Sequence, residues 1–174
     1  LILLLAKLAN FVPEGGIWMN TQRPEWNDAN NALVGKGISV VTLGYLRRYL
    51  VFCRDLFAQS ALKSLSISEE VWQLLGQIGQ ALEQFAPLLK GVFSDEQRRQ
   101  MMDRLGEAAS GYRHHYYHEG FSGEQVNAPL AEIITFLDAA QRHVEHALRA
   151  NKRPDDLYHA YNVIHFEDGR AAIS

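Results

Sequence analysis

The segment around which the chain is organised runs from Arg23 to Tyr49 and reads RPEWNDANNALVGKGISVVTLGYLRRY. It begins with a dense polar group at Glu25–Asp28, followed by Asn30 and Asn31. A carboxylate next to a Trp, in a loop that leads into a helix, is well suited to binding a sugar. The ring covers the apolar face of a pyranose, and the carboxyl and amide groups reach its hydroxyls. We therefore expect this loop to be the functional part of the chain.

The second half of the segment predicts a long amphipathic helix from about Ser39 to Phe57. Its apolar residues recur every three or four positions, which is the spacing of one wide helix face. We expect that whole face to be buried. Its residues are Val41, Tyr45, Leu46, Tyr49, Leu50, Phe52, Cys53, Leu56 and Phe57.

Further helices are expected on both sides of this one. Leu1–Phe11 reads as an apolar helix, although a buried strand has the same pattern. Ser66–Glu69 and Ser94–Gln97 both have the capping-box pattern, the first opening a long helix and the second a shorter one. Asn127–Pro129 begins a fourth helix, which Asn151 ends.

No stretch of the chain alternates strictly between apolar and polar residues, so no β-sheet is required. The Pro- and Gly-containing stretch Val12–Pro24 reads as a loop. The tail Asp155–Ser174 has a mixed pattern, in which Tyr158, Tyr161, Asn162 and His165 suggest a polar-aromatic loop. The predicted fold is therefore all-α, built from antiparallel helical hairpins. Three helical stripes should share one core: Leu46, Leu50 and Phe57; Leu75, Ile78 and Leu82; and Ile134, Leu137 and Val144.

Composition excludes several classes of protein. A hydrophobic content of 47% with 21% charged residues is typical of a globular protein and not of a disordered one. A net charge of -3 gives no electrostatic basis for binding nucleic acid. Cys53 is the single cysteine, which excludes an internal disulfide and favours a reducing, cytoplasmic location. The apolar run at Leu1–Phe11 is too short to span a membrane.

The polar group also resembles a known motif. Trp26–Asp28, then Asn31, Val34–Gly35 and a small-residue spacer into a helix, is similar to the DWNDGMN…VG…ES segment of the cellobiose and chitobiose phosphorylases. The departures are Glu25 for the leading Asp of that segment, Ala29–Asn30 for its Gly-Met, and Ile38 for the Glu before Ser39.

The resemblance implies part of an (α/α)6 barrel that acts on glycosidic bonds with inversion. It assigns the general acid to Asp28 and substrate contacts to Trp26, Glu25, Asn27 and Asn31. The substrate would be a disaccharide or oligosaccharide, and no cofactor is implied. A phosphorylase would take inorganic phosphate as co-substrate, whereas an inverting hydrolase needs a second carboxylate to activate water.

Other interpretations stay open. Residues 1–174 form either a single all-α domain or a piece of a larger catalytic barrel, since neither end has a clear boundary signal. The chain could instead be a non-catalytic helical interaction module, in which Asp28 caps a short helix and Trp26 fills the core. If it is a piece of a barrel, apolar helix faces should be exposed and promote self-association.

A histidine cluster is the one candidate metal site. His114 and His118 have the i,i+4 spacing of a helix, and His115 lies three residues before His118. That spacing suits a metal ion, but no HExxH arrangement or cysteine partner accompanies it. We therefore expect a polar helix face and no bound metal.

Overall fold

The computed structural model describes residues 1–20 and 32–174 of the chain. Its helices are α1 (Ile2–Leu8), α3 (Val40–Ala58), α4 (Glu69–Phe85), α5 (Asp95–His118) and α6 (Leu130–Ala150), with a 3-10 helix η1 (Ala86–Lys90) after α4. Its strands are β1 (Phe11–Val12), β2 (Gly16–Trp18), β3 (Gly37–Ser39), β4 (Ser64–Ser68), β5 (Gln125–Pro129), β6 (Tyr161–Glu167) and β7 (Arg170–Ile173).

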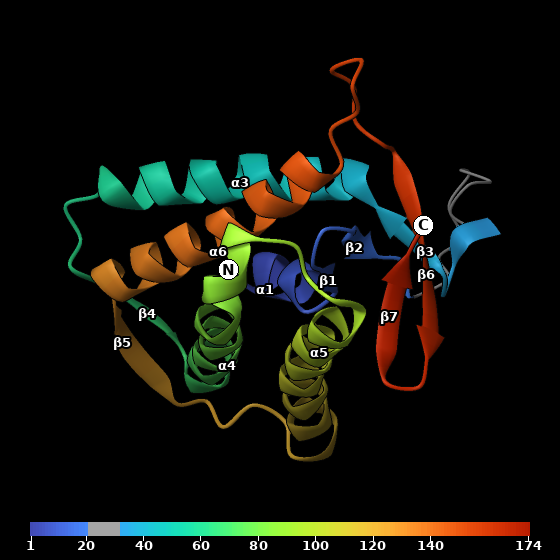
Figure 1. The fold of residues 1–174 in the computed structure, drawn as a ribbon. Coiled ribbons are helices and arrows are strands. Elements are labelled where there is room, and N and C mark those ends of the chain that lie inside the picture. Colours follow the sequence, from blue (N-terminus) through green and yellow to red (C-terminus); the bar gives the residue numbers. More distant parts are fainter. Residues whose placement is uncertain (21–31) are drawn as a thin grey trace.

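The prediction of an all-α fold, and with it of a part of an (α/α)6 barrel, is wrong. Strands β1, β2, β3, β6 and β7 form an antiparallel sheet in that order, and β4 pairs with β5 in a separate two-stranded ribbon. The fold is therefore a mixture of helices and strands. The larger sheet lies at one end of the group of helices (Figure 1). The two stretches read as loops, at Val12–Pro24 and Asp155–Ser174, supply β2, β6, β7 and the second residue of β1.

Two tight turns explain why such short strands form. Strands β6 and β7 are joined by Asp168 and Gly169, whose φ angles of 39° and 78° are both positive. Asp-Gly is the preferred pair for a two-residue hairpin turn with this geometry. Between β1 and β2, Glu14 adopts a φ of 61° and Gly16 a φ of 135°. Local turn chemistry thus specifies both hairpins, although their strands show no alternation of buried and exposed residues.

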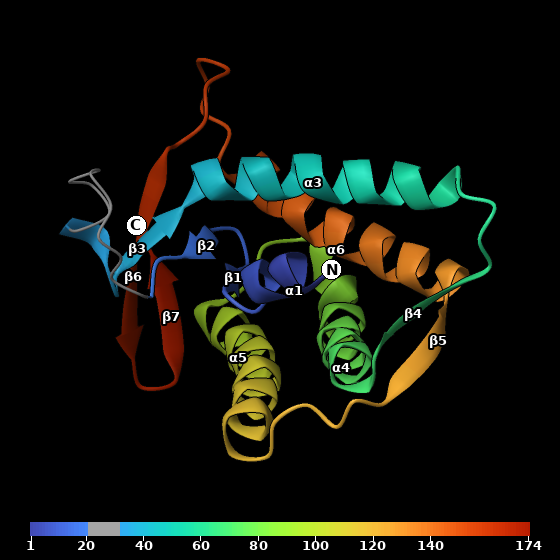
Figure 2. The ribbon, with the colours of Figure 1, turned by 180° about the vertical axis from the view of Figure 1, so that it is seen from behind.

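The helices pack in two antiparallel pairs, α3 with α6 and α4 with α5 (Figures 1 and 2). All nine residues of the three predicted stripes belong to one hydrophobic cluster, seven of them buried and Phe57 and Ile134 partly buried. The prediction of a shared helical core is therefore confirmed. However, α3 and α6 are not consecutive, so of these two pairs only α4 with α5 is a true hairpin.

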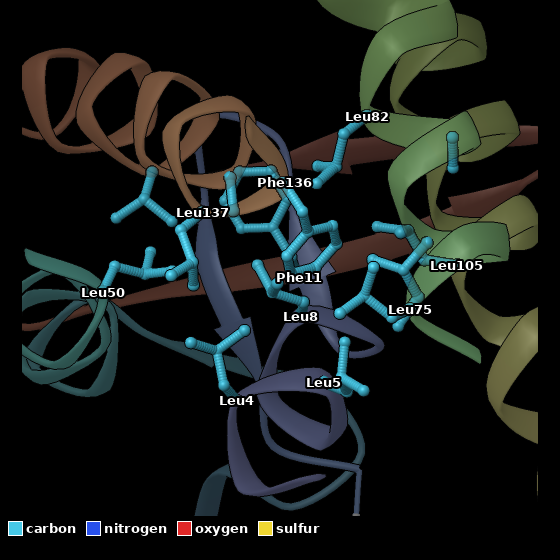
Figure 3. Close-up of a cluster of buried hydrophobic side chains, with 14 of the residues drawn as sticks. Leu4, Leu5, Leu8, Phe11, Leu50, Leu75, Leu82, Leu105, Phe136 and Leu137 are labelled. Atoms are coloured by element: carbon cyan, nitrogen blue, oxygen red, sulfur yellow. The ribbon is translucent and has the colours of Figure 1, made fainter. Parts of the chain in front are cut away.

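Helix α1 occupies the middle of this core. Figure 3 shows Leu4, Leu5 and Leu8 between side chains from α3, α4, α5 and α6, with Phe11 next to them. The apolar start of the chain is therefore a short core helix, which ends before Phe11 begins the first strand. In the part of the chain that the structure describes, no helix is both long and apolar enough to cross a membrane.

The predicted helix ends are partly right. Ser94 caps α5 with a complete capping box, and Asn151 follows the last residue of α6, as expected. Helix α4 is capped by Ser68 and not by Ser66, which lies in β4. Helix α5 continues to His118 and is longer than predicted, because the aromatic and histidine cluster extends it.

The outer half of α3 differs from expectation. Leu43, Leu46, Leu50 and Cys53 are buried, but the other side of the same apolar face is open to solvent. The interpretation of all its apolar positions as one buried side is therefore wrong. The exposed residues are Val41, Tyr45, Tyr49, Phe52 and Leu56.

A buried arginine connects the sheet to α5. The side chain of Arg98 is 6% exposed and pairs with the carboxylate of Glu14, which is 10% exposed, at 2.9 Å. Arg98 also donates to the carbonyl oxygens of Pro13 at 3.0 Å and Ala171 at 2.8 Å. One side chain therefore holds the β1–β2 turn and β7 against the first turn of α5.

Candidate functional site

The residues that the sequence singled out as a site all fall in one segment. Glu25, Trp26, Asn27, Asp28 and Asn31 lie within residues 21–31, outside the described residues. Their assigned roles therefore stay predictions. What the structure does describe is the framework on both sides of that segment.

The two flanks of the segment are joined by hydrogen bonds. The amide of Met19 donates to the carbonyl of Gly37 at 2.8 Å, and the amide of Gly35 donates to the carbonyl of Met19 at 2.6 Å. The indole Nε1 of Trp18 donates to the carbonyl of Gly35 at 3.1 Å. Together with the pairing of β2 and β3, these bonds hold the residues before and after the segment next to each other.

A groove of about 810 Å³ opens beside the first flank, and we name it the Trp18 groove. This volume is in the range of pockets that hold small ligands. Its walls come from the end of α1, from β2, from the middle of α5 and from β6. Residues that line it include Asn10, Trp18, Asn20, Arg99, Asp103 and Phe166.

Two aromatic rings and a guanidinium form one wall of the groove. The rings of Trp18 and Phe166 meet edge to face, with centroids 5.6 Å apart and an interplanar angle of 68°. The guanidinium carbon of Arg99 lies 5.3 Å from the centroid of the Phe166 ring. Trp18 is further fixed by its bond to Gly35, so the wall is ordered before any ligand binds.

Amides and a carboxylate supply the polar part of the groove. Asn20 donates to the side-chain oxygen of Asn10 at 2.6 Å, and Asn10 donates in turn to the carbonyl of Ala6 at 2.9 Å. The Nε of Arg99 donates to both carboxylate oxygens of Asp103, at 2.8 and 2.9 Å. Such groups can donate to and accept from the hydroxyls of a ligand whose apolar face rests on the aromatic wall.

The histidine cluster lies on the last turns of α5. The ring centroids of His114 and His118 are 4.3 Å apart. Nδ1 of His115 lies 3.2 Å from Oε2 of Glu119. Among residues 1–20 and 32–174, no three His, Cys, Asp or Glu side chains are grouped in a way that could hold a metal ion.

Two buried titratable groups lie away from the Trp18 groove. Hydrogen bonds from the hydroxyl and the amide of Ser122 lower the pKa of Glu70 to about 2. Burial lowers the pKa of His143 to about 4, and its Nε2 donates to the carbonyl of Leu82. Since Nε2 carries the proton, Nδ1 of His143 is an unprotonated acceptor, and it is buried without a hydrogen-bond partner. Neither group lines the Trp18 groove, and the contacts of both are with the protein's own helices and loops.

Sequence reasoning missed the lining of the Trp18 groove. Trp18 follows Gly15 and Gly16 in a short stretch that reads as a loop, and Arg99 reads as an ordinary polar residue of a helix. The groove brings together residues from Ala9 to Phe166, and no local pattern indicates that proximity. The one available signal was Asp168–Gly169, which predicts the hairpin that presents Phe166.

Comparison with models of protein families found no match to this chain, and neither did a search of curated proteins.

Proposed function

We propose that this chain belongs to an enzyme that acts on glycosidic bonds and binds part of its saccharide substrate in the Trp18 groove. The observation that carries the proposal is the lining of the groove. Trp18 and Phe166 form a fixed aromatic wall. Asn10, Asn20 and Asp103 supply hydrogen-bond donors and acceptors for the hydroxyl groups of a sugar. Pyranose rings require this combination because each has an apolar face and an equatorial rim of hydroxyl groups.

The chemistry is assigned to the segment that starts where the groove ends. Asn20 lines the groove and immediately precedes residues 21–31, which contain Glu25–Asp28. In this proposal Asp28 protonates the glycosidic oxygen, and Trp26, Glu25, Asn27 and Asn31 contact the sugar, as the resemblance implies. The attacking group would be inorganic phosphate in a phosphorylase or water in an inverting hydrolase.

Binding tests the groove by itself. Cellobiose and chitobiose should be titrated into the protein, with the indole resonances followed by NMR. Trp18→Ala should weaken binding by about 10-fold or more, because it removes most of the apolar contact. Trp18→Phe keeps a ring but loses the bond to Gly35, so its effect should be smaller. Tyr117→Ala is the matched control, since Tyr117 is 76% exposed and does not line the groove.

Turnover tests the acid. Asp28→Asn removes the transferable proton at nearly constant size, so turnover of an unactivated disaccharide should fall by at least about 100-fold while binding persists. Substrates with an activated leaving group should lose much less. Failure of both sugars to bind at millimolar concentration would refute the groove assignment, and an Asp28→Asn variant with undiminished turnover would refute the role of Asp28.

A further inference from the structure

An apolar stripe runs along the outer side of α3. Its members are 39–65% exposed: Val41, Tyr45, Tyr49, Phe52 and Leu56. In both views of the fold, α3 lies along one edge of the molecule, with its inner side on α6 (Figures 1 and 2). An exposed apolar stripe along one helix face is a candidate interaction surface, because the largest apolar patch on a protein is often functional.

We propose that this stripe is a dimer interface, in which α3 packs antiparallel against α3 of a second copy of the chain. The order of its residues fits a two-fold axis. Tyr45, Tyr49, Phe52 and Leu56 are separated by four, three and four positions, a spacing that reads the same in both directions. A two-fold interface needs such self-complementarity, because the same surface patch of each copy contacts that of the other in the opposite direction.

The symmetric register pairs residues of complementary size. About an axis between Leu50 and Val51, Tyr45 lies opposite Leu56 of the partner subunit, and Tyr49 lies opposite Phe52 of the partner subunit. Each copy therefore places an aromatic ring against an aliphatic or aromatic side chain across the interface. Side-chain pairs of this kind pack well between helices that cross at a small angle.

Charges along the stripe fit the same register. Arg48 and Asp55 lie on one edge of the stripe, and the two-fold axis brings Arg48 within about 3 Å, measured along the helix, of the level of Asp55 of the partner subunit. The neighbouring cations already have partners within the chain. Arg47 pairs with Glu145 at 2.9 Å and Arg54 with Asp138 at 3.3 Å, both on α6. Asp55 also pairs with Arg54 of its own chain at 3.2 Å, and its side chain is 50% exposed. The interface would add Arg48 of the partner subunit beside this carboxylate, which gives two contacts between the copies.

Further apolar surface continues the stripe at its ends. Tyr158 and Val41 line the same hollow of about 660 Å³ at the start of α3, and Leu157 beside it is 61% exposed. Antiparallel pairing brings the far end of the partner helix, followed by Leu62 of the partner subunit, to this hollow. The three aromatic side chains of α3 alone offer on the order of 300 Å² per copy. With both ends included, the buried area approaches the lower range for stable dimers, so dissociation should be micromolar.

The oligomeric state of the chain of 174 residues tests the proposal. Sedimentation equilibrium or light scattering at about 100 µM should give twice the monomer mass of 19.7 kDa. Phe52→Glu should return the mass to that of a monomer, with unchanged circular dichroism, because Phe52 is 61% exposed and supports no core. Val92→Glu is the matched control: Val92 is 83% exposed and lies off the stripe, so this variant should stay dimeric.

Charge reversal tests the antiparallel register. Arg48→Glu and Asp55→Arg should each weaken the dimer several-fold, and the combined variant should restore it. A chain that is monomeric at about 100 µM, or a dimer that survives Phe52→Glu, would overturn the proposed interface. A combined variant no tighter than the single variants would overturn the antiparallel arrangement.

Discussion

The buried pair of Arg98 and Glu14 predicts a large loss of stability when the arginine is removed. Arg98→Met keeps the aliphatic stem but deletes the hydrogen bonds to Pro13, Ala171 and Glu14. The carboxylate of Glu14, only 10% exposed, then keeps a single donor, the amide of Phe93 at 3.1 Å. A buried charge that loses its partner costs about 3–5 kcal/mol, so Arg98→Met should lower the free energy of unfolding by that amount.

Urea unfolding followed by circular dichroism is the appropriate assay. The midpoint should fall with little change in the m-value, and the thermal midpoint should drop by on the order of 10 °C for a chain of this size. Adding Glu14→Gln removes the stranded charge, so the double variant should lose less than the sum of the two single variants. Arg104→Met is the control, because its contact with Glu107 is 3.9 Å long and exposed. It should cost about 0.5 kcal/mol or less.

A loss of less than about 1 kcal/mol in Arg98→Met, or a double variant that is simply additive, would contradict the role of the stranded carboxylate. Either result would mean that water compensates the carboxylate of Glu14 once the guanidinium is gone. The pair would then contribute geometry at the β1–β2 turn and little free energy.

Two further predictions concern the core and the sheet. Since the pKa of His143 is about 4 when folded and near 6.5 when unfolded, the unfolded chain binds the extra proton between these values. Stability should be complete above pH 6.5 and fall by about 3 kcal/mol as the pH drops to 4. His143→Gln should remove that slope in urea titrations at several pH values, and an unchanged slope would exclude His143 as its source. At Gly16, where φ is 135°, a Cβ would lie 2.7 Å from the carbonyl oxygen of Ser39. Gly16→Ala should therefore cost about 1–3 kcal/mol and expose the amides of β2 and β3 to hydrogen exchange, whereas unchanged protection would contradict the close approach.

The helical part of the fold could be predicted from sequence because its signals are long and local. The stripe at Leu75, Ile78 and Leu82 and the cap at Ser94 both have the residues that their structures require within a few positions. Strands β1, β2 and β3 have only two or three residues, too few for a period of two to show, and the seven residues of β6 do not alternate between buried and exposed. Strand β3 pairs with β6 across more than a hundred residues, from Gly37 to Val163. Such pairing depends on how the helices between β3 and β6 bring these two strands together, which no local pattern encodes.

The candidate site divides in the same way. The polar group at Glu25–Asp28 is visible in the sequence because its residues are adjacent. The Trp18 groove is not, because Asn10, Arg99 and Phe166 come together only after the sheet has formed against α5. The α3 helix gave a third outcome: its spacing predicted an apolar face correctly, but spacing alone cannot tell a face buried within the chain from one left for a partner.

The β4–β5 ribbon constrains the order in which the chain folds. Its pairs join Ser64 to Pro129 and Ser68 to Gln125, so everything from α4 to the end of α5 lies inside one closed loop. Closing a loop of that length costs entropy before any strand bond is gained, whereas α4 and α5 contact each other through a short connection. We therefore expect the α4–α5 hairpin to form early and the ribbon late. Substitutions in the ribbon should then accelerate unfolding while leaving the refolding rate almost unchanged.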